Sequence, residues 1–285
     1  MLTAGEVKTS RWHYMAGPPG FEPGTFGSGG RRPIQARPRA LLKTLNHTVN
    51  LTCSLPKLQV IAVDIDGTLT DRAGLLDPNA VATLQFLIRM GIRVVLVSGR
   101  SFFSTGTLST YLVGSGLVVA ENGGVLGCYP HSMHVLADRM VVEKALAVLK
   151  KRMGNVVQVE NMPDRITDVV CRRTFNLETA NRILNEEDVP AKVVDTSFAY
   201  HIMDKRCNKG RALQVLAQQY GFDLDRCCAF GDYDNDIPLL EVCRIGIAVG
   251  NASSKLKEVA TYVSQSKYGA GFVEGIRWLI RTNLL

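Results

Sequence analysis

The stretch Val60-Ile61-Ala62-Val63-Asp64-Ile65-Asp66-Gly67-Thr68-Leu69-Thr70-Asp71 decides how the chain is expected to fold. Its apolar, β-branched first half is typical of a buried parallel strand. The two carboxylates and the glycine that follow predict a sharp polar turn at the carboxyl end of this strand, where open α/β sheets bind their ligands. We expect the chain to break at or just after Asp64, so that Asp64 and Asp66 reach one pocket, and Gly67 permits that break.

Strand and helix patterns alternate on both sides of this stretch. Asp77-Pro78 is a typical helix start, and Gly91 ends the helical spacing that follows. This alternation predicts an α/β fold in which a doubly wound, Rossmann-like parallel sheet forms the core. Further buried strands are predicted at 92–97, 117–120, 227–230 and 245–249, with a short antiparallel strand at 125–128 and helices from 101, 208, 238, 254 and 271.

The pattern changes in the middle of the chain. Helices at 141–153 and 177–187, with strands at 156–160, 166–173, 191–195 and 199–203, give an order unlike that of the flanking parts. We therefore predict an inserted α+β cap domain at 136–204 and a core made of 58–135 and 205–285.

The positive charge is concentrated at the N-terminus. The net charge is +7, and residues 1–57 hold eight Lys or Arg against two Asp or Glu, so six of the seven charges lie there. This Gly-, Pro- and Arg-rich leader is predicted to be disordered. Its segment 17–25 resembles peptides from transfer-RNA genes translated by mistake, so the leader is either a mis-annotated start or a basic tail. The nearly neutral remainder is not expected to bind nucleic acid.

The composition also bears on membranes and redox state. No run approaches the roughly twenty apolar residues of a membrane span, and the N-terminus lacks the apolar centre of a signal peptide. Seven cysteines without a CxxC pair fit neither a disulfide framework nor a zinc site. We expect a cytoplasmic protein, either a monomer or a homodimer.

Four polar turns follow predicted core elements and together hold the groups that phosphoryl transfer requires. That reaction needs an in-line nucleophile, a proton donor for the leaving oxygen and cations that hold the charged oxygens. Taken singly, each of these side chains is also typical of a solvated turn or a helix cap. The residues are Asp64 and Asp66 in the first turn, Ser98 in the second, Lys209 in the third, and Asp232 and Asp236 in the fourth.

These turns match the four motifs of the haloacid-dehalogenase-like hydrolases, which the sequence resembles from Val60 to its C-terminus. The pattern hhhhDxDGTLxD fits Ile61 to Asp71, and GDxxND fits Gly231 to Asp236. Between them lie the expected hydroxyl, Ser98, and the expected lysine, Lys209. Most members of this family are magnesium-dependent phosphatases.

The resemblance implies a role for each residue. Asp64 would attack phosphorus to form an aspartyl-phosphate, and Asp66 would be the general acid and base. Lys209 and Ser98 would bind the phosphoryl group. Mg²⁺ would be held by Asp64, Asp232, Asp236 and the backbone carbonyl of Asp66. The partner would thus be a small phosphorylated metabolite.

The insertion point and compact size of the cap resemble the C2-capped branch of the family, and archaeal phosphoglycolate phosphatases most of all. The implied reaction is hydrolysis of 2-phosphoglycolate, with a Cof-type or sucrose-phosphate-type sugar phosphatase as the alternative. A phosphate-sensing or RNA-associated module is the non-enzymatic alternative. Tyr233 departs from the small residues common at its position and is expected to narrow the pocket.

A carboxylated substrate calls for a cation in the cap. The candidates are Arg165, Arg172, Arg173 and His201, although arginines of this kind also commonly solvate the face of a sheet.

Overall fold

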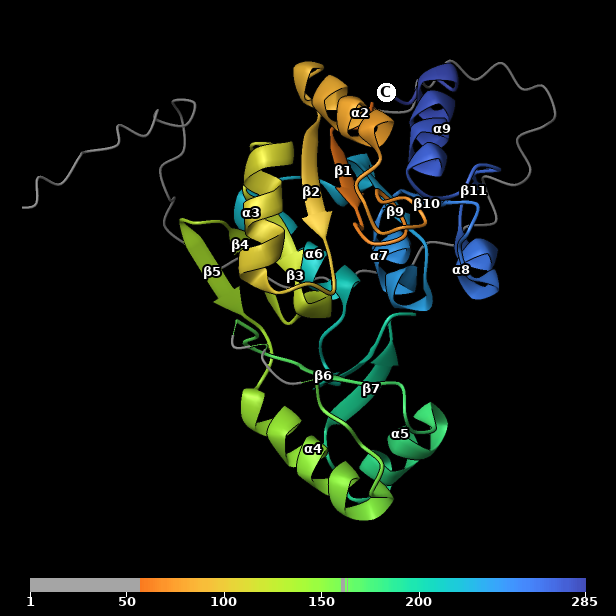
Figure 1. The fold of residues 1–285 in the computed structure, drawn as a ribbon. Helices are drawn as coiled ribbons and strands as arrows, with labels where there is room; N and C mark the ends of the chain where they lie inside the picture. Colours follow the sequence, from red (N-terminus) through yellow and green to blue (C-terminus); the bar gives the residue numbers. More distant parts are fainter. Residues whose placement is uncertain (1–56, 160–161, 163) are drawn as a thin grey trace, which may run out of the picture. The chain divides into compact units, whose positions relative to one another are not determined.

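The computed structural model describes residues 57–159, 162 and 164–285 (Figure 1). The predicted leader at 1–57 lies outside the described residues, apart from Lys57. Within the described part, the chain forms a large, mostly parallel sheet with helices on both faces and a separate small antiparallel sheet. The prediction of an α/β core with an inserted cap is confirmed.

The core sheet has β1 at its centre. Its order is β11-β10-β9-β1-β2-β3-β4-β5, and β11 to β3 run parallel whereas β4 and β5 are antiparallel additions. In the β1 register, Ala62 lies opposite Val95 on one side and Ala229 on the other. The strands are β1 (Val60–Val63), β2 (Arg93–Val97), β3 (Leu117–Ala120), β4 (Val125–Cys128), β5 (Ser132–Val135), β9 (Cys227–Gly231), β10 (Ile245–Ala248) and β11 (Tyr262–Val263).

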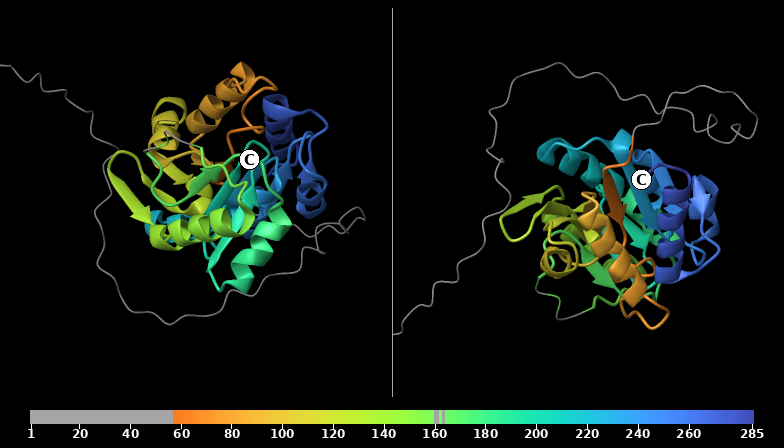
Figure 2. Two further views of the ribbon diagram at one scale, coloured as in Figure 1. Left: turned by 60° about the horizontal axis from the view of Figure 1, so that its bottom comes forward. Right: turned by 90° about the horizontal axis from the view of Figure 1, so that it is seen from above.

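Alternating side chains of β1 belong to two separate apolar layers. Ile61 and Val63 pack in one layer with α2 (Pro78–Arg89), α3 (Phe102–Leu112) and α9 (Tyr268–Arg281). Val60 and Ala62 pack in the other layer, which includes α6 (Lys209–Tyr220), α7 (Ile237–Val242) and α8 (Ser254–Val259). Figure 2 shows the helices on the two sides of this sheet. Because every residue of β1 is buried, the polar turn that follows it is fixed in space.

Local capping agrees with the sequence signals. Asp77 accepts hydrogen bonds from the backbone N–H groups of Asn79 and Ala80 at the start of α2, and Pro78 occupies its first turn. Asn208 caps α6 in the same way, through the N–H of Arg211. Three short 3₁₀ turns complete the core: η1 (Glu121–Gly123), η2 (Leu224–Arg226) and η3 (Asp234–Asp236).

The cap consists of a three-stranded antiparallel sheet with two helices on one face. The sheet order is β6-β8-β7, and the helices pack on it through a third apolar layer. The elements are α4 (Arg139–Met153), β6 (Val169–Cys171), α5 (Leu177–Glu186), β7 (Ala191–Asp195) and β8 (Tyr200–Asp204). The domain boundaries at 136 and 204 stay predictions.

The predicted strand at 156–160 is wrong as far as the structure describes that segment. Gln158 makes an isolated bridge with Cys171, supported by two backbone hydrogen bonds, Val159 N–H to Val170 O and Arg172 N–H to Val157 O. Just before this bridge, the side chains of Asn155 and Thr174 each donate a hydrogen bond to the backbone carbonyl of the other residue. The sequence also gave no signal for β5 or β11, which are short and largely exposed.

Among the helices that the structure describes, none combines the length and the apolar character that crossing a membrane requires.

A close approach of two helices positions Lys209, and it can be tested by substitution. A Cβ at Gly210 would lie 2.1 Å from the carbonyl oxygen of Pro238 in α7, which is backbone and cannot rotate away. We expect Gly210→Ala to destabilise the fold by about 1–3 kcal/mol, despite the better helix propensity of alanine. Urea unfolding would measure this.

Gln218→Ala, an exposed change on the same helix, is the matched control and should stay within about 0.5 kcal/mol. An unfolding midpoint for Gly210→Ala equal to that of the control would contradict the close contact of α6 with α7.

Candidate active site

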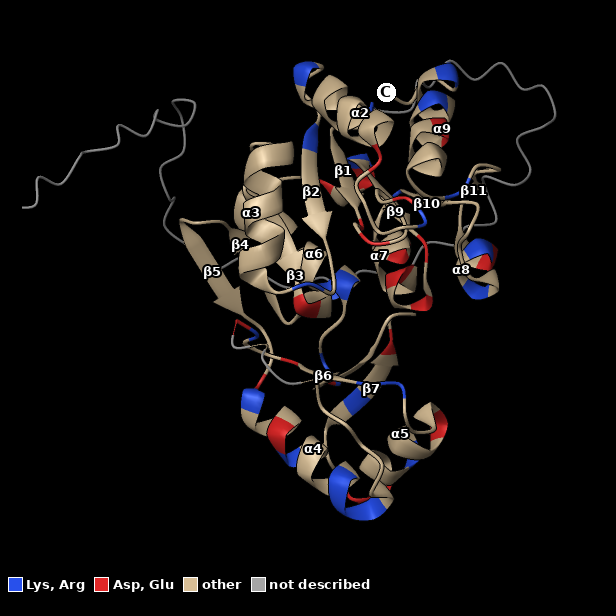
Figure 3. Cartoon of the chain, viewed as in Figure 1, with Lys and Arg blue, Asp and Glu red and all other residues tan. Residues whose placement is uncertain are grey.

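The carboxyl ends of three adjacent parallel strands bring polar side chains to one edge of the core sheet. Asp64 follows β1, Ser98 follows β2 and Asp232 follows β9, and these strands are neighbours in the order β9-β1-β2. Lys209, the first residue of α6, and Asp236 in η3 join them. Figure 3 marks acidic residues in red on the loops near the ends of β9 and α7.

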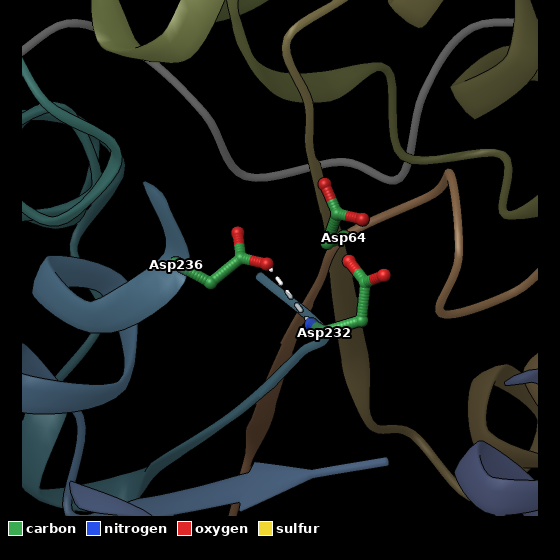
Figure 4. Close-up of side chains that lie close together, drawn as sticks. All are labelled: Asp64, Asp232 and Asp236. Atoms are coloured by element: carbon green, nitrogen blue, oxygen red, sulfur yellow. Dashed lines mark hydrogen bonds between the residues drawn. The ribbon is translucent and has the colours of Figure 1, made fainter. Parts of the chain in front are cut away.

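Asp64, Asp232 and Asp236 form a cluster of carboxylates. One oxygen of each lies within 4.8 Å of one from each of the others. Figure 4 shows the three groups turned toward a common space. The backbone N–H of Asp232 donates to Asp236 Oδ2 at 3.0 Å, and the N–H of Tyr233 donates to the same oxygen at 3.2 Å. The loop itself therefore orients Asp236.

Lys209 is the cation at the centre of this cluster. Its side chain is almost fully buried, and its Nζ donates to Asp64 Oδ1 and to Asp236 Oδ1, each at 2.6 Å. Burial alone would lower the pKa of Lys209, but the attraction of Asp236 and Asp64 outweighs it and raises that pKa above its ordinary value. Lys209 is thus held in its charged form.

One lysine does not balance three acids. Burial raises the pKa of Asp64 to about 7, with Lys209 opposing the shift and Asp236 adding to it. Burial and the repulsion of Asp64 and Asp236 likewise raise the pKa of Asp232, to about 9. Protons or a further cation must compensate such a group. Three carboxylates at this spacing are suited to a hard divalent cation.

Asp66 has a different partner. Its two carboxylate oxygens accept hydrogen bonds from Arg100, at 2.7 Å from Nε and 2.6 Å from Nη2. These two parallel hydrogen bonds fix the plane of the Asp66 carboxylate relative to the plane of the Arg100 guanidinium. Arg100 follows β2, so the turns after β1 and β2 are tied together by a pair that is only partly buried.

Ser98 is buried at the end of β2. Its Oγ accepts a hydrogen bond of 3.1 Å from the N–H of Arg100, and its own hydroxyl hydrogen has no acceptor among the described residues. The hydroxyl is therefore free to donate at the sheet edge.

The structure thus joins Asp64, Asp232, Asp236 and Lys209 in one cluster and places Asp66 and Ser98 in the neighbouring turns.

Three further residues shape the site, and of these only Gly67 was assigned a part from the sequence, as the residue that lets the chain turn. Arg100 holds Asp66, and Asn251 donates from Nδ2 to the carbonyl of Gly67 at 3.0 Å and to Asp232 Oδ2 at 3.3 Å. Gly67 has φ +85°, and a Cβ there would lie 2.1 Å from Asp232 Oδ2. The Ser98-Gly99-Arg100 turn was a usable signal, because an arginine there must also lie at this edge.

Most of the cap cations suggested by the sequence have partners within the fold. Arg165 donates from Nη1 to both oxygens of Asp168 at 2.8 Å and from Nη2 to the carbonyl of Gly99 at 2.9 Å. His201 Nδ1 also lies 2.6 Å from Asp168 Oδ2.

The other two suggested cations are exposed. Arg173 donates to Asp195 Oδ2 at 2.7 Å, and the Arg172 side chain has no partner in the described part of the chain. Arg165 therefore links the cap to the turn after β2, because it bonds both Asp168 and Gly99. Arg173 forms an ion pair with Asp195 at the surface.

A pocket of about 450 Å³ lies between the cap sheet and the acidic loop. Its wall includes residues of β7 and β8 on the cap side, and Lys209 and the 233–235 segment on the core side. Tyr233 lines it, as its bulk suggested, and its hydroxyl donates to Asp195 Oδ2 over 3.4 Å.

Comparison with known proteins agrees with this geometry. Residues 61–162 and 171–276 match the haloacid dehalogenase-like hydrolase family. A phosphoglycolate phosphatase of Archaeoglobus fulgidus is 37% identical over 224 residues, which cover 78% of this chain and 97% of that protein. One of Methanothrix thermoacetophila is 35% identical over 217 residues, covering 76% and 95% respectively.

Among solved structures, a Thermoplasma acidophilum protein shares the fold with a TM-score of 0.70 at 23% identity, covering 81% of this chain and all of that one. The family match spans most of the chain and includes every residue of the carboxylate cluster. The chain belongs to the haloacid dehalogenase-like hydrolases.

Proposed function

We propose that this protein is a Mg²⁺-dependent phosphomonoesterase that hydrolyses 2-phosphoglycolate to glycolate and phosphate through an aspartyl-phosphate. The observation that carries the proposal is the buried cluster in which Lys209 joins Asp64 to Asp236, with Asp232 beside them. The substrate is suggested by relatives named phosphoglycolate phosphatase, at about a third of identical positions.

The donor set fits a magnesium ion. Asp64, Asp232 and Asp236 supply hard oxygen ligands at compatible spacing, and the carbonyl of Asp66 is the fourth candidate ligand. Two of these acids, Asp64 and Asp232, have raised pKa values because burial and the repulsion of neighbouring acids disfavour their charged forms. When bound, the metal neutralises the repulsion between a carboxylate nucleophile and an anionic phosphate.

Asp64 is the nucleophile in this mechanism. Lys209 holds Oδ1 of Asp64, and Oδ2 has no hydrogen-bond partner in the described part of the chain. Oδ2 attacks phosphorus, the ester oxygen leaves, and a covalent aspartyl-phosphate divides one displacement into two.

Asp66 moves the proton. It donates to the leaving oxygen in the first step and accepts a proton from the attacking water in the second. Arg100 occupies both oxygens of Asp66 in this structure, so one Arg100 hydrogen bond must open for the transfer.

Ser98 and Lys209 complete the phosphoryl site. Ser98 donates its free hydroxyl hydrogen to a phosphate oxygen, and Lys209 places a buried positive charge beside the same group.

A second substrate class is favoured by the pocket. A volume of about 450 Å³ lies within the range of sites for drug-sized ligands, about 300–1,000 Å³, and exceeds what a two-carbon acid fills. A sugar phosphate is therefore the alternative substrate.

The compartment we propose is the cytoplasm. Cys128, Cys171, Cys207, Cys227 and Cys228 are free thiols. Several unpaired thiols in one chain support a reducing environment.

Replacement of the nucleophile tests the mechanism. Asp64→Asn should lower hydrolysis of an aryl phosphate by at least about a thousandfold, because the amide cannot form the acyl phosphate. Steady-state turnover is the measurement, and circular dichroism checks the fold. Asp225→Asn, an exposed acid in η2, is the control and should keep full activity. Retained turnover in Asp64→Asn would exclude Asp64 as nucleophile.

The acid cluster should make stability depend on pH in a metal-dependent way. Because Asp64 and Asp232 have raised pKa values, their contribution is present below about pH 4 and is lost as the pH rises through about 7 and 9. Asp204, whose pKa Arg206 lowers to about 2, acts in the opposite sense: its contribution is present above about pH 4, is lost as the pH falls through about 2, and so does not change between pH 5 and pH 9. The melting temperature of chelator-treated protein should therefore fall between about pH 5 and pH 9.

Mg²⁺ should reverse this loss, and more strongly at high pH, because it binds the deprotonated acids. Asp232→Asn should flatten the pH dependence of the metal-free protein and reduce the Mg²⁺-induced rise in melting temperature, which we expect to be at least about 3 °C in the native chain. An equal Mg²⁺ effect in both proteins would argue against Asp232 as a ligand.

A panel of phosphate esters at equal concentration tests the substrate. We expect kcat/KM for 2-phosphoglycolate to exceed that for hexose phosphates by about tenfold or more. A tenfold ratio corresponds to a difference of about 1.4 kcal/mol in transition-state binding. The reverse order would favour the sugar-phosphate alternative while leaving the phosphatase chemistry intact.

A further inference from the structure

The pocket beside Lys209 has one wall made by the inner face of the cap sheet. Ala191 and Val193 of β7 are buried against α4 and α5, so the alternation of a strand turns Lys192 and Val194 to the opposite face. Met203 is the cross-strand neighbour of Lys192 and lines the same pocket. Lys192 therefore stands on an apolar surface that faces the core site.

The acids around this pocket already have cations. Asp195 pairs with Arg173 at 2.7 Å, and Asp234 pairs with Lys255 at 3.2 Å while also accepting from Ser253 Oγ at 2.6 Å. Neither acid has a hydrogen bond or ion pair with Lys192.

Lys192 itself has no hydrogen-bond or ion-pair partner within the part of the chain that the structure describes. Asp204, the acid whose charge acts on it, is bound by Arg206 through Nε at 3.0 Å and Nη2 at 2.6 Å. Burial lowers the pKa of Lys192, as expected for an ammonium group that has lost water without gaining an anion.

The pocket wall thus carries one uncompensated charge, and that charge is positive. Lys209 lines the same pocket and bonds the proposed nucleophile, Asp64. A substrate that reaches from Asp64 past Lys209 would place its other end in this pocket, beside β7. A partly buried ammonium on a flexible four-carbon stem is suited to an anionic group placed there.

We propose that Lys192 binds a second anionic group, a carboxylate, on the leaving group of the substrate, and so selects acidic phosphate esters. The proposal rests on the phosphatase function proposed above and adds the residue that sets its substrate class. It also moves that role from the arginines suggested by sequence to a lysine on β7.

Binding to a chain that cannot turn over isolates this role. In the Asp64→Asn background with Mg²⁺ present, calorimetry compares 2-phosphoglycolate with ethyl phosphate, which has the same two carbons and no carboxylate. Adding Lys192→Met should weaken 2-phosphoglycolate roughly ten- to hundredfold and ethyl phosphate less than about threefold. Lys192→Arg should restore most of the affinity, because it restores the charge.

Lys205→Met is the matched control. Lys205 is exposed, lies close enough to act on Lys192, and bonds Asn185 Oδ1 at 3.1 Å outside the pocket, so its loss removes the same charge from the same region. It should leave the affinity for both esters unchanged. Thermal melts of each variant check folding.

Several results would overturn the proposal. They are equal weakening of both esters by Lys192→Met, no weakening of either, or 2-phosphoglycolate binding no tighter than ethyl phosphate before Lys192 is changed. The unsubstituted chain is assayed first on an aryl phosphate. Hydrolysis there upholds the phosphatase function even if Lys192 fails, whereas no hydrolysis removes the proposed function and the proposal together.

Discussion

A single ammonium group, that of Lys209, is shared by carboxylates that lie 145 and 27 residues away in the sequence. These contacts are buried, so each charge has given up water for its partner. Asp232 is left outside this pairing, and burial together with the repulsion of Asp64 and Asp236 raises its pKa. The site is thus built with a deficit of positive charge, and a fold that keeps such a deficit is prepared for a cation from outside.

The rest of the core holds the carboxylates of this cluster in fixed positions relative to one another. Pairing of β1 with β9 sets Val63 opposite Phe230, and the N–H of Asp64 donates to the carbonyl of Phe230 at 3.1 Å. A register shift of one residue would turn Asp64 away from Asp232 and expose apolar side chains at the same time. The apolar layers on both sides of the sheet therefore fix the geometry of the acids, and the absence of a side chain at Gly67 leaves room for Asp232.

The sequence was informative where one local signal decides the structure. The buried strands were predictable because unbroken apolar runs end in polar turns, and parallel strands place those turns at one edge, so the cluster of Asp64, Asp232, Asp236 and Lys209 could be anticipated. The strand predicted at 156–160 is reduced to an isolated bridge of Gln158 with Cys171, and how far two segments pair is a tertiary outcome that propensity does not contain. Nor does sequence reveal that Arg165 is occupied by Asp168.

The charged side chains of the core cluster and those of the cap differ in whether the fold already pairs them. Of the groups proposed to act on phosphorus, Asp64 and Asp66 each accept hydrogen bonds from a cation of the fold, so changing either of them disturbs its partner. In the cap, Arg165, Arg173 and His201 are likewise committed to acids of the fold, whereas Lys192 is not. Replacing a charged side chain that has no partner in the described part of the fold breaks no internal ion pair. If Lys192 selects the leaving group as proposed, that choice can vary at one position of β7 while the cluster held by Lys209 stays unchanged.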